Sequence, residues 1–175
     1  MRQQQALTDF FAGLTEYTFH VRLGVADPSL TDYLSGLLSR FIRSDAVYRL
    51  RSLGGRPLRQ VTDMFTEAEQ RVGDARREAH RHIGDFTLFW VGVYPEALPH
   101  LKSDDSKDEL VDFREQGRRC YDIAAQIEPS DDAQPGGELL SRLSDDYDLC
   151  AFGLREVRRQ WQTPEDGDEG PLLIN

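Results

Sequence analysis

Residues 57–94 carry the feature that most constrains how this chain can fold. Mostly apolar residues recur there in alternating steps of three and four, without a slip of phase. The row consists of Leu58, Val61, Phe65, Ala68, Val72, Ala75, Ala79, His82, Phe86, Phe89 and Val93. Such steps place side chains on one face of an α-helix. We therefore predict a single helix over 57–94, because a hairpin would not need to preserve the row.

Gly73 and Asp74 leave a second interpretation open. A glycine can end one helix and an aspartate can begin the next, so these two residues would divide the segment. A continuous helix over 57–94 would be about 57 Å long at a rise of about 1.5 Å per residue, which is long for a domain of this size. In either case the helix ends at Tyr94, because Pro95 disfavours helical geometry in the residue before it.

The first part of the chain shows the same helical period, and the alternation typical of strands is nowhere sustained. A first helix over about 4–22 is expected to bury Phe10, Leu14, Tyr17 and Val21. Asp27 and Pro28 then begin a second helix, since aspartate caps helices and proline suits their first position. That helix is expected to end after Leu53 and to bury Leu30, Leu34, Leu37, Phe41 and Tyr48.

Two more helices are predicted in the second half. Ser106 and Glu109 form a capping box, which begins a helix that buries Leu110, Phe113, Gly117, Cys120, Ala124 and Ile127. After the turn-rich segment 129–137, a last helix buries Leu140, Leu143, Tyr147, Cys150, Leu154, Val157 and Trp161. The sequence thus predicts an all-α, single-domain bundle of five or six helices with one long central helix, over residues 1–163. Residues 164–175 are expected to form an acidic, mobile tail.

Charge and composition exclude several classes of partner. The formal net charge of −10 opposes binding to duplex nucleic acid, which is driven by basic residues that displace counterions from phosphates. No apolar run approaches the roughly 18 residues that a membrane span requires, so no membrane partner is expected. The chain has two cysteines and no apolar export signal at its start, which favours a reducing cytoplasm over a disulfide framework.

A polar strip interrupts the inward face of 57–94. At about 100° per residue, Glu78, His82 and Asp85 fall on one side of the helix, whereas His80 and Arg81 point elsewhere. Carboxylates and imidazole together suit a divalent metal, and bundle-core metal sites are built from such inward strips. Asp45 of the second helix is the candidate that would complete the site. The spacing matches neither the Glu-x-x-His element of di-iron bundles nor the His-Glu-x-x-His element of zinc proteases.

A structural interpretation of the same strip is favoured over metal binding. His82 would be a core histidine that is hydrogen-bonded to Glu78 or to a tyrosine, while Arg81 pairs with Asp85 four residues on. A salt bridge to an arginine would likewise explain Asp45, because an unpaired buried charge is costly. No nucleophile elbow, phosphate-binding loop, dinucleotide fingerprint or paired Cys-x-x-Cys is present.

The run from Phe86 to Tyr94 is apolar on every side, so it must be covered all round. We expect it at the centre of the domain; a homodimer through this region, Trp90 included, is the alternative. Cys120 and Cys150 both fall in inward rows and are expected to be free, buried thiols.

These observations favour a non-enzymatic interaction or assembly component that acts through its surface, with a protein partner or a second copy of itself. The alternative is a metal- or cofactor-dependent helical-bundle enzyme, of the oxygenase or hydrolase type, centred on Glu78, His82 and Asp85. The sequence does not decide between them, and it names no substrate.

Overall fold

The computed structural model describes residues 1–43, 47–48, 50–103, 106–132 and 135–162, and within them the protein is an all-α single domain. Eight α-helices, one π-helix and one 3-10 helix are present in these ranges. They are α1 (Arg2–Glu16), the π-helix η1 (Tyr17–Arg22), α2 (Pro28–Phe41), α4 (Val61–Gln70), α5 (Gly73–Gly92), the 3-10 helix η2 (Pro95–Ala97), α6 (Leu98–Leu101), α7 (Phe113–Gln126), α8 (Gly137–Asp145) and α9 (Tyr147–Gln162). None of these helices is both long enough and apolar enough to cross a bilayer.

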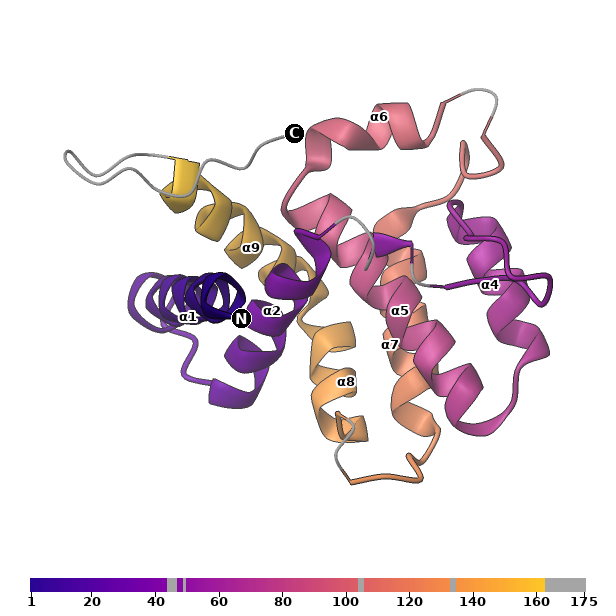
Figure 1. The fold of residues 1–175 in the computed structure, drawn as a ribbon, viewed down its shortest axis with the longest axis horizontal. Coiled ribbons are helices and arrows are strands. Elements are labelled where there is room, and N and C mark those ends of the chain that lie inside the picture. The colour runs from indigo at the N-terminus through magenta and orange to yellow at the C-terminus, as the bar shows by residue number, and fades with distance from the viewer. Residues whose placement is uncertain (44–46, 49, 104–105, 133–134, 163–175) are drawn as a thin grey trace.

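Helix α5 is the centre of the bundle, as predicted. It packs against α7, α4, α9 and α2, and Figure 1 shows α5 and α7 side by side, with α4 on one flank and α1 and α2 on the other. Leu88, Val91 and Val93 are each at most 1% exposed. The chain's own helices therefore cover the apolar run at the end of α5, and a second subunit is not needed to cover it.

The prediction of one helix over 57–94 is wrong. Arg71 and Val72 adopt extended backbone, and Gly73 has a φ of +58°, a left-handed conformation that favours glycine. The chain turns at these residues, and α4 packs back against α5. Val72 and Ala75, the members of the apolar row beside the turn, are exposed, whereas Ala68 of α4 and Ala79 of α5 are buried. Phase alone cannot separate one helix from two that meet in this way.

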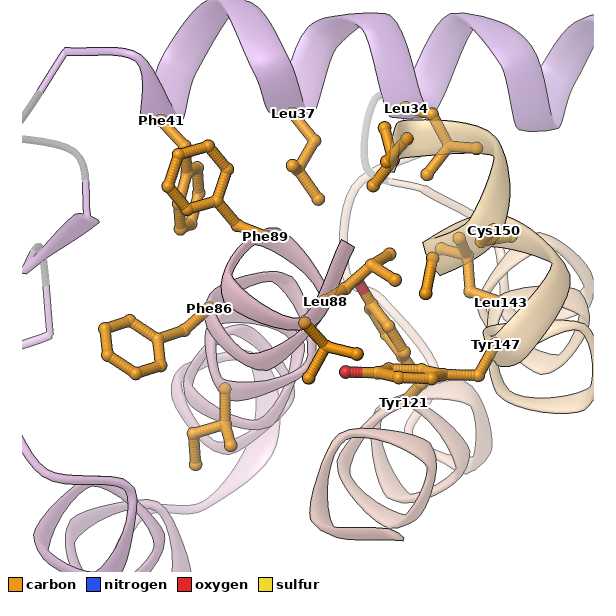
Figure 2. Packing of buried hydrophobic residues seen from close by; sticks show 14 of the residues in the cluster. Leu34, Leu37, Phe41, Phe86, Leu88, Phe89, Tyr121, Leu143, Tyr147 and Cys150 are labelled. Atoms are coloured by element: carbon orange, nitrogen blue, oxygen red, sulfur yellow. The ribbon is translucent and has the colours of Figure 1, made fainter. Parts of the chain in front are cut away.

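Helix α2 begins as predicted and ends sooner. The Asp27 carboxylate accepts a hydrogen bond from the Leu30 amide at 3.2 Å, and Pro28 is the first helical residue. The predicted inward row of α2 is buried: Figure 2 shows Leu34, Leu37 and Phe41 together with residues of α5. The ring centroids of Phe41 and Phe89 lie 5.4 Å apart. The helix ends at Phe41 and does not reach 53.

The N-terminal helix turns a different face to the core than the one predicted. Phe10, Tyr17 and Val21 are 37%, 51% and 65% exposed. The buried row lies one residue on and includes Phe11, Thr15 and Thr18. Two of these buried residues are threonines, so the spacing of apolar residues alone does not reveal this row. The Thr18 hydroxyl is satisfied locally, because it donates to the Leu14 carbonyl at 2.8 Å.

The helix predicted to begin at Ser106 begins later, at Phe113. Asp112 caps it by accepting hydrogen bonds from the amides of Arg114 and Glu115, and Leu110 is 92% exposed rather than buried. Asp108, in the preceding loop, is occupied elsewhere: its two oxygens cap the start of α4. The capping-box pattern could not predict this, because the loop that contains it is held by amides at the start of α4, which is distant in the sequence.

The last helix is interrupted at Asp146 and forms α8 and α9. Its predicted inward row is buried except at the end, where Trp161 is only partly buried. Cys120 and Cys150 are fully buried and free, as expected. Burial raises the pKa of both thiols to about 12.

Candidate functional site

A pocket of about 300 Å³ opens where α5 meets the end of α2 and the segment that precedes α4. Its lining consists of Arg40, Phe41, Leu50, Arg51, Arg71, Glu78, Ala79, Arg81, His82 and Asp85. Three of the residues predicted as a site, Glu78, His82 and Asp85, therefore do lie around one pocket. The fourth, Asp45, lies outside the described residues.

Asp85 is an anchored carboxylate at the inner end of this group. It is 3% exposed, and its Oδ1 accepts hydrogen bonds from the hydroxyls of Tyr33 at 2.6 Å and Tyr121 at 2.7 Å. Its Oδ2 accepts from Arg40 Nη2 at 3.2 Å. Tyr33 and Arg40 belong to α2 and Tyr121 to α7, so Asp85 ties α5 to both helices. A buried charge needs such partners, and here they also fix the Arg40 side chain at the pocket.

The two tyrosines are permanent hydrogen-bond donors. Burial raises the pKa of Tyr33 and of Tyr121 well above the ordinary value, and the negative charge of Asp85 raises both further. Neither phenol can therefore act as a base near neutral pH. Tyr121 reaches Asp85 because Gly84 leaves room for its ring, as a Cβ at position 84 would lie 2.6 Å from the nearest ring carbon.

Glu78 and His82 lie in different settings. Glu78 accepts a hydrogen bond from Arg81 Nη2 at 2.9 Å. The ion pair predicted between Arg81 and Asp85 is replaced by this one, since Arg40 takes the place of partner to Asp85. The His82 imidazole is partly buried and stacks on Phe41, with 5.8 Å between ring centroids and 30° between planes. His82 thus presents an aromatic ring to the pocket.

His80 was predicted to point away from the core, and that prediction is wrong. Its side chain is fully buried, packs edge-on to Phe65 and lies 3.1 Å from Glu69 through Nε2. The cause is the turn at Gly73, because α4 then covers the side of α5 that a single straight helix would leave in solvent. Burial, together with the positive charge of Arg76, lowers the pKa of His80 to about 4. His80 is therefore a neutral packing residue away from the pocket.

The sequence did not predict that arginines from several elements would line one pocket. Arg40, Arg51, Arg71 and Arg81 face two carboxylates, Glu78 and Asp85, so the lining carries a formal charge of +2 when His82 is neutral. The whole chain has a charge of −10. These arginines are ten or more residues apart along the sequence and form no motif. Only the turn at Gly73 and the packing of α2 on α5 bring them together.

The pocket arginines differ in how fully their donors are used. Arg71 is engaged, since it donates to Glu67 and, through Nη2, to the Arg51 carbonyl at 2.8 Å. Arg51 donates to the Gly55 carbonyl at 3.0 Å. The Nε atoms of Arg40 and Arg81 are buried and have no acceptor among the described residues. The same is true of the Nε atoms of Arg118, Arg142, Arg155 and Arg158 outside the pocket. A buried donor without an acceptor costs about 1–3 kcal/mol, so an anion that accepted hydrogen bonds from Arg40 and Arg81 would remove that cost at the pocket.

Arg81 keeps its charge at any physiological pH. Burial acts to lower its pKa, but Tyr33, Asp85 and Glu78 act to raise it, and the resulting pKa lies above the ordinary value. Its side chain is only 13% exposed. A fixed positive charge that is shielded from water attracts an anion more strongly than the same charge on the surface.

The described residues contain no group of three His, Cys, Asp or Glu side chains placed to hold a metal ion. Asp85 already accepts hydrogen bonds at both oxygens, and Glu78 is paired with Arg81. Metal binding by Glu78, His82, Asp85 and Asp45 stays a prediction.

No protein-family model matches the chain, and no curated protein or solved structure matches it significantly. No activity can therefore be carried over from a relative. The function has to be argued from the chemistry of the pocket.

Proposed function

We propose that the protein is a non-enzymatic binding protein that takes a small anionic ligand in the pocket beside α5. The observation that carries the proposal is the convergence of four arginines on about 300 Å³ in a strongly acidic chain. Guanidinium groups bind carboxylates and phosphates through paired hydrogen bonds and stay charged when they are partly buried. A cytoplasmic location is part of the proposal, and the two free, buried thiols support it.

Electrostatics supports a ligand of negative charge. Four guanidinium groups around one small volume repel one another. Asp85, Glu78 and Glu67 each pair with one of them, which leaves Arg51 without an ion pair among the described residues. A bound anion would provide that pair. It would also supply acceptors for the buried Nε atoms of Arg40 and Arg81.

Binding is favoured over catalysis by the state of the acidic groups. A general base needs an acceptor atom within reach of the proton that it removes. Both oxygens of Asp85 are engaged, and Tyr33 and Tyr121 hold their protons. Glu78 is ion-paired with Arg81 through Oε2, and its buried Oε1 has no hydrogen-bond donor among the described residues. These groups position the arginines and give the site its shape.

Thermal unfolding in a series of anions tests the proposal. At matched ionic strength, phosphate and citrate should raise the melting temperature relative to chloride, since a ligand that binds only the folded state stabilises it. Arg51→Gln should reduce this ligand-induced rise. Arg51 is exposed and its side chain donates to one loop carbonyl, so the variant should fold.

Arg114→Gln is the matched control, because Arg114 is a surface arginine outside the pocket that pairs with Asp148. It should keep the full rise. An equal rise in wild type and both variants would contradict the proposal, as would no rise in wild type.

A divalent metal held by Glu78, His82 and Asp85 is the second candidate, and with it the enzyme predicted as the alternative from sequence. The observation in its favour is that all three residues line the same pocket. Elemental analysis of protein purified without a metal-affinity step tests it, with His82→Ala as the comparison. A stoichiometric metal that disappears in His82→Ala would support this candidate, and metal-free wild type would end it.

A further inference from the structure

We infer that a second copy of this chain packs on the outward face of α1 and η1, so that the protein forms a reversible homodimer. The inference goes beyond the proposed function, because none of the residues that carry it lines the anion pocket. Two features of the described residues carry it: an exposed apolar row whose spacing is symmetric, and charges of opposite sign at the two ends of that row.

The outward face of α1 and η1 carries an apolar row. Phe10, Tyr17 and Val21 are exposed, and Leu14 between them is only partly buried. Steps of four, three and four residues keep these side chains on one side of a helix. A single exposed apolar residue is ordinary on a protein surface, whereas apolar residues gathered in one patch are typical of an interaction site.

The row is accessible to a partner molecule. Helix α1 packs on α2 and α9, and it does so through a different face, which buries Phe11, Thr15 and Thr18. Figure 1 shows α1 at the edge of the bundle. A helix in this position can lie against a helix of a second molecule without any change in the packing of its own domain.

The spacing of the row fits an antiparallel pair of identical helices. Steps of four, three and four are the same in both directions along the chain, so a two-fold axis between Leu14 and Tyr17 places Phe10 against Val21 of the second copy. Leu14 then lies against Tyr17 of the second copy. A two-fold interface uses the same patch on both subunits, so the patch has to be complementary to itself. This row meets that requirement.

Charges beside the row favour the same arrangement. Asp9 precedes Phe10 and Arg22 follows Val21, so the antiparallel pair brings Asp9 of each copy close to Arg22 of the other. Both side chains are available: Asp9 is exposed, and Arg22 is 47% exposed with a long ion pair to Glu156, at 4.0 Å. A parallel pair would place like charges side by side, which is unfavourable. Charge complementarity therefore indicates a second copy in the antiparallel orientation.

The size of the row indicates a reversible dimer. Four apolar side chains cover only part of the about 800 Å² per partner that a standard interface buries. The dimer should therefore form as the protein concentration rises and dissociate on dilution.

Sedimentation velocity over a range of concentrations tests the inference on the full chain. Val21→Lys should weaken dimerisation on the order of tenfold or more, because it places a charge within the apolar row. Leu110→Lys is the matched control, since Leu110 is 92% exposed and lies outside α1 and η1. It should dimerise like the wild type. Circular dichroism checks that both variants are folded.

A charge exchange tests the antiparallel orientation. Asp9→Lys alone and Arg22→Glu alone should each weaken dimerisation, because each leaves like charges facing each other across the two-fold axis. An equimolar mixture of the two variants should recover the dimer, because each new charge then meets its opposite on the other variant.

The outcomes are distinct from those of the anion series. A wild type that stays monomeric at every concentration would overturn the inference, as would a Val21→Lys variant that dimerises as the wild type does. A mixture of Asp9→Lys and Arg22→Glu that dimerises no better than either variant alone would also overturn it. None of these results affects the anion pocket, which the thermal unfolding series tests separately.

Discussion

Gly84→Ala probes the close approach of α5 and α7 on which the site depends. A Cβ at position 84 would lie 2.6, 2.7 and 2.8 Å from three carbons of the Tyr121 ring, which is well inside contact distance. Tyr121 is fully buried, and its hydroxyl is held by Asp85 at 2.7 Å. The ring cannot move aside without giving up that hydrogen bond or separating the two helices.

The expected cost follows from three effects. Forcing an extra carbon into a packed core costs about 1–3 kcal/mol. Loss of the hydrogen bond to the charged Asp85 adds about 1.5–3 kcal/mol. Replacing a glycine within a helix by alanine returns about 1 kcal/mol. We therefore expect Gly84→Ala to lower the free energy of unfolding by about 2–4 kcal/mol, since the first two effects outweigh the third.

Urea unfolding followed by circular dichroism measures this difference. Gly13→Ala is the control, because Gly13 lies within α1 and a Cβ there meets nothing within 4 Å. It should stabilise the protein by about 0.5–1 kcal/mol through helix propensity alone. If Gly84→Ala were neutral or stabilising like Gly13→Ala, the packing of Tyr121 against Gly84 and the anchoring of Asp85 would both be refuted.

Three further predictions follow from the same contacts. Asp108→Ala should lower the free energy of unfolding in urea by about 2 kcal/mol, because Asp108 accepts hydrogen bonds from two amides at the start of α4. An unchanged midpoint of urea unfolding would argue against that cap. His80 has a pKa of about 4 in the fold against 6.5 ordinarily, so the unfolded chain binds the extra proton between these values and stability should fall as pH drops from about 6.5 to about 4. His80→Gln should flatten that part of the stability profile relative to wild type, and parallel profiles would count against the buried neutral imidazole. Asp85→Asn should destabilise the fold but retain or tighten phosphate binding, because it removes a negative charge from the lining. Calorimetry measures that binding. Loss of binding in folded protein would instead favour a direct ligand role for Asp85.

Helical periodicity was sufficient for the fold class and for several inward faces, because burial on a helix repeats every three to four residues. The row from Leu30 to Phe41 and the cap at Asp27 are local features, and both are confirmed. The turn at Gly73 was not predictable from phase, since two helices that pack on each other preserve it.

The candidate site was only partly predictable for a related reason. The spacing along one helix face predicted that Glu78, His82 and Asp85 lie close together. The structure places all three around one pocket. The arginines come from distant parts of the chain and meet only after the helices pack. His80 was misplaced because its environment is made by α4, which covers α5 only when the chain turns at Gly73.

The most direct test of the arginine pocket is an NMR titration that follows the Nε–H groups of the arginines as phosphate is added. The account predicts that the Nε–H signals of Arg40 and Arg81 shift and saturate together, because these buried donors gain an acceptor, while that of Arg114 stays in place. Signals of Arg40 and Arg81 that do not move, or that move no more than that of Arg114, would contradict it.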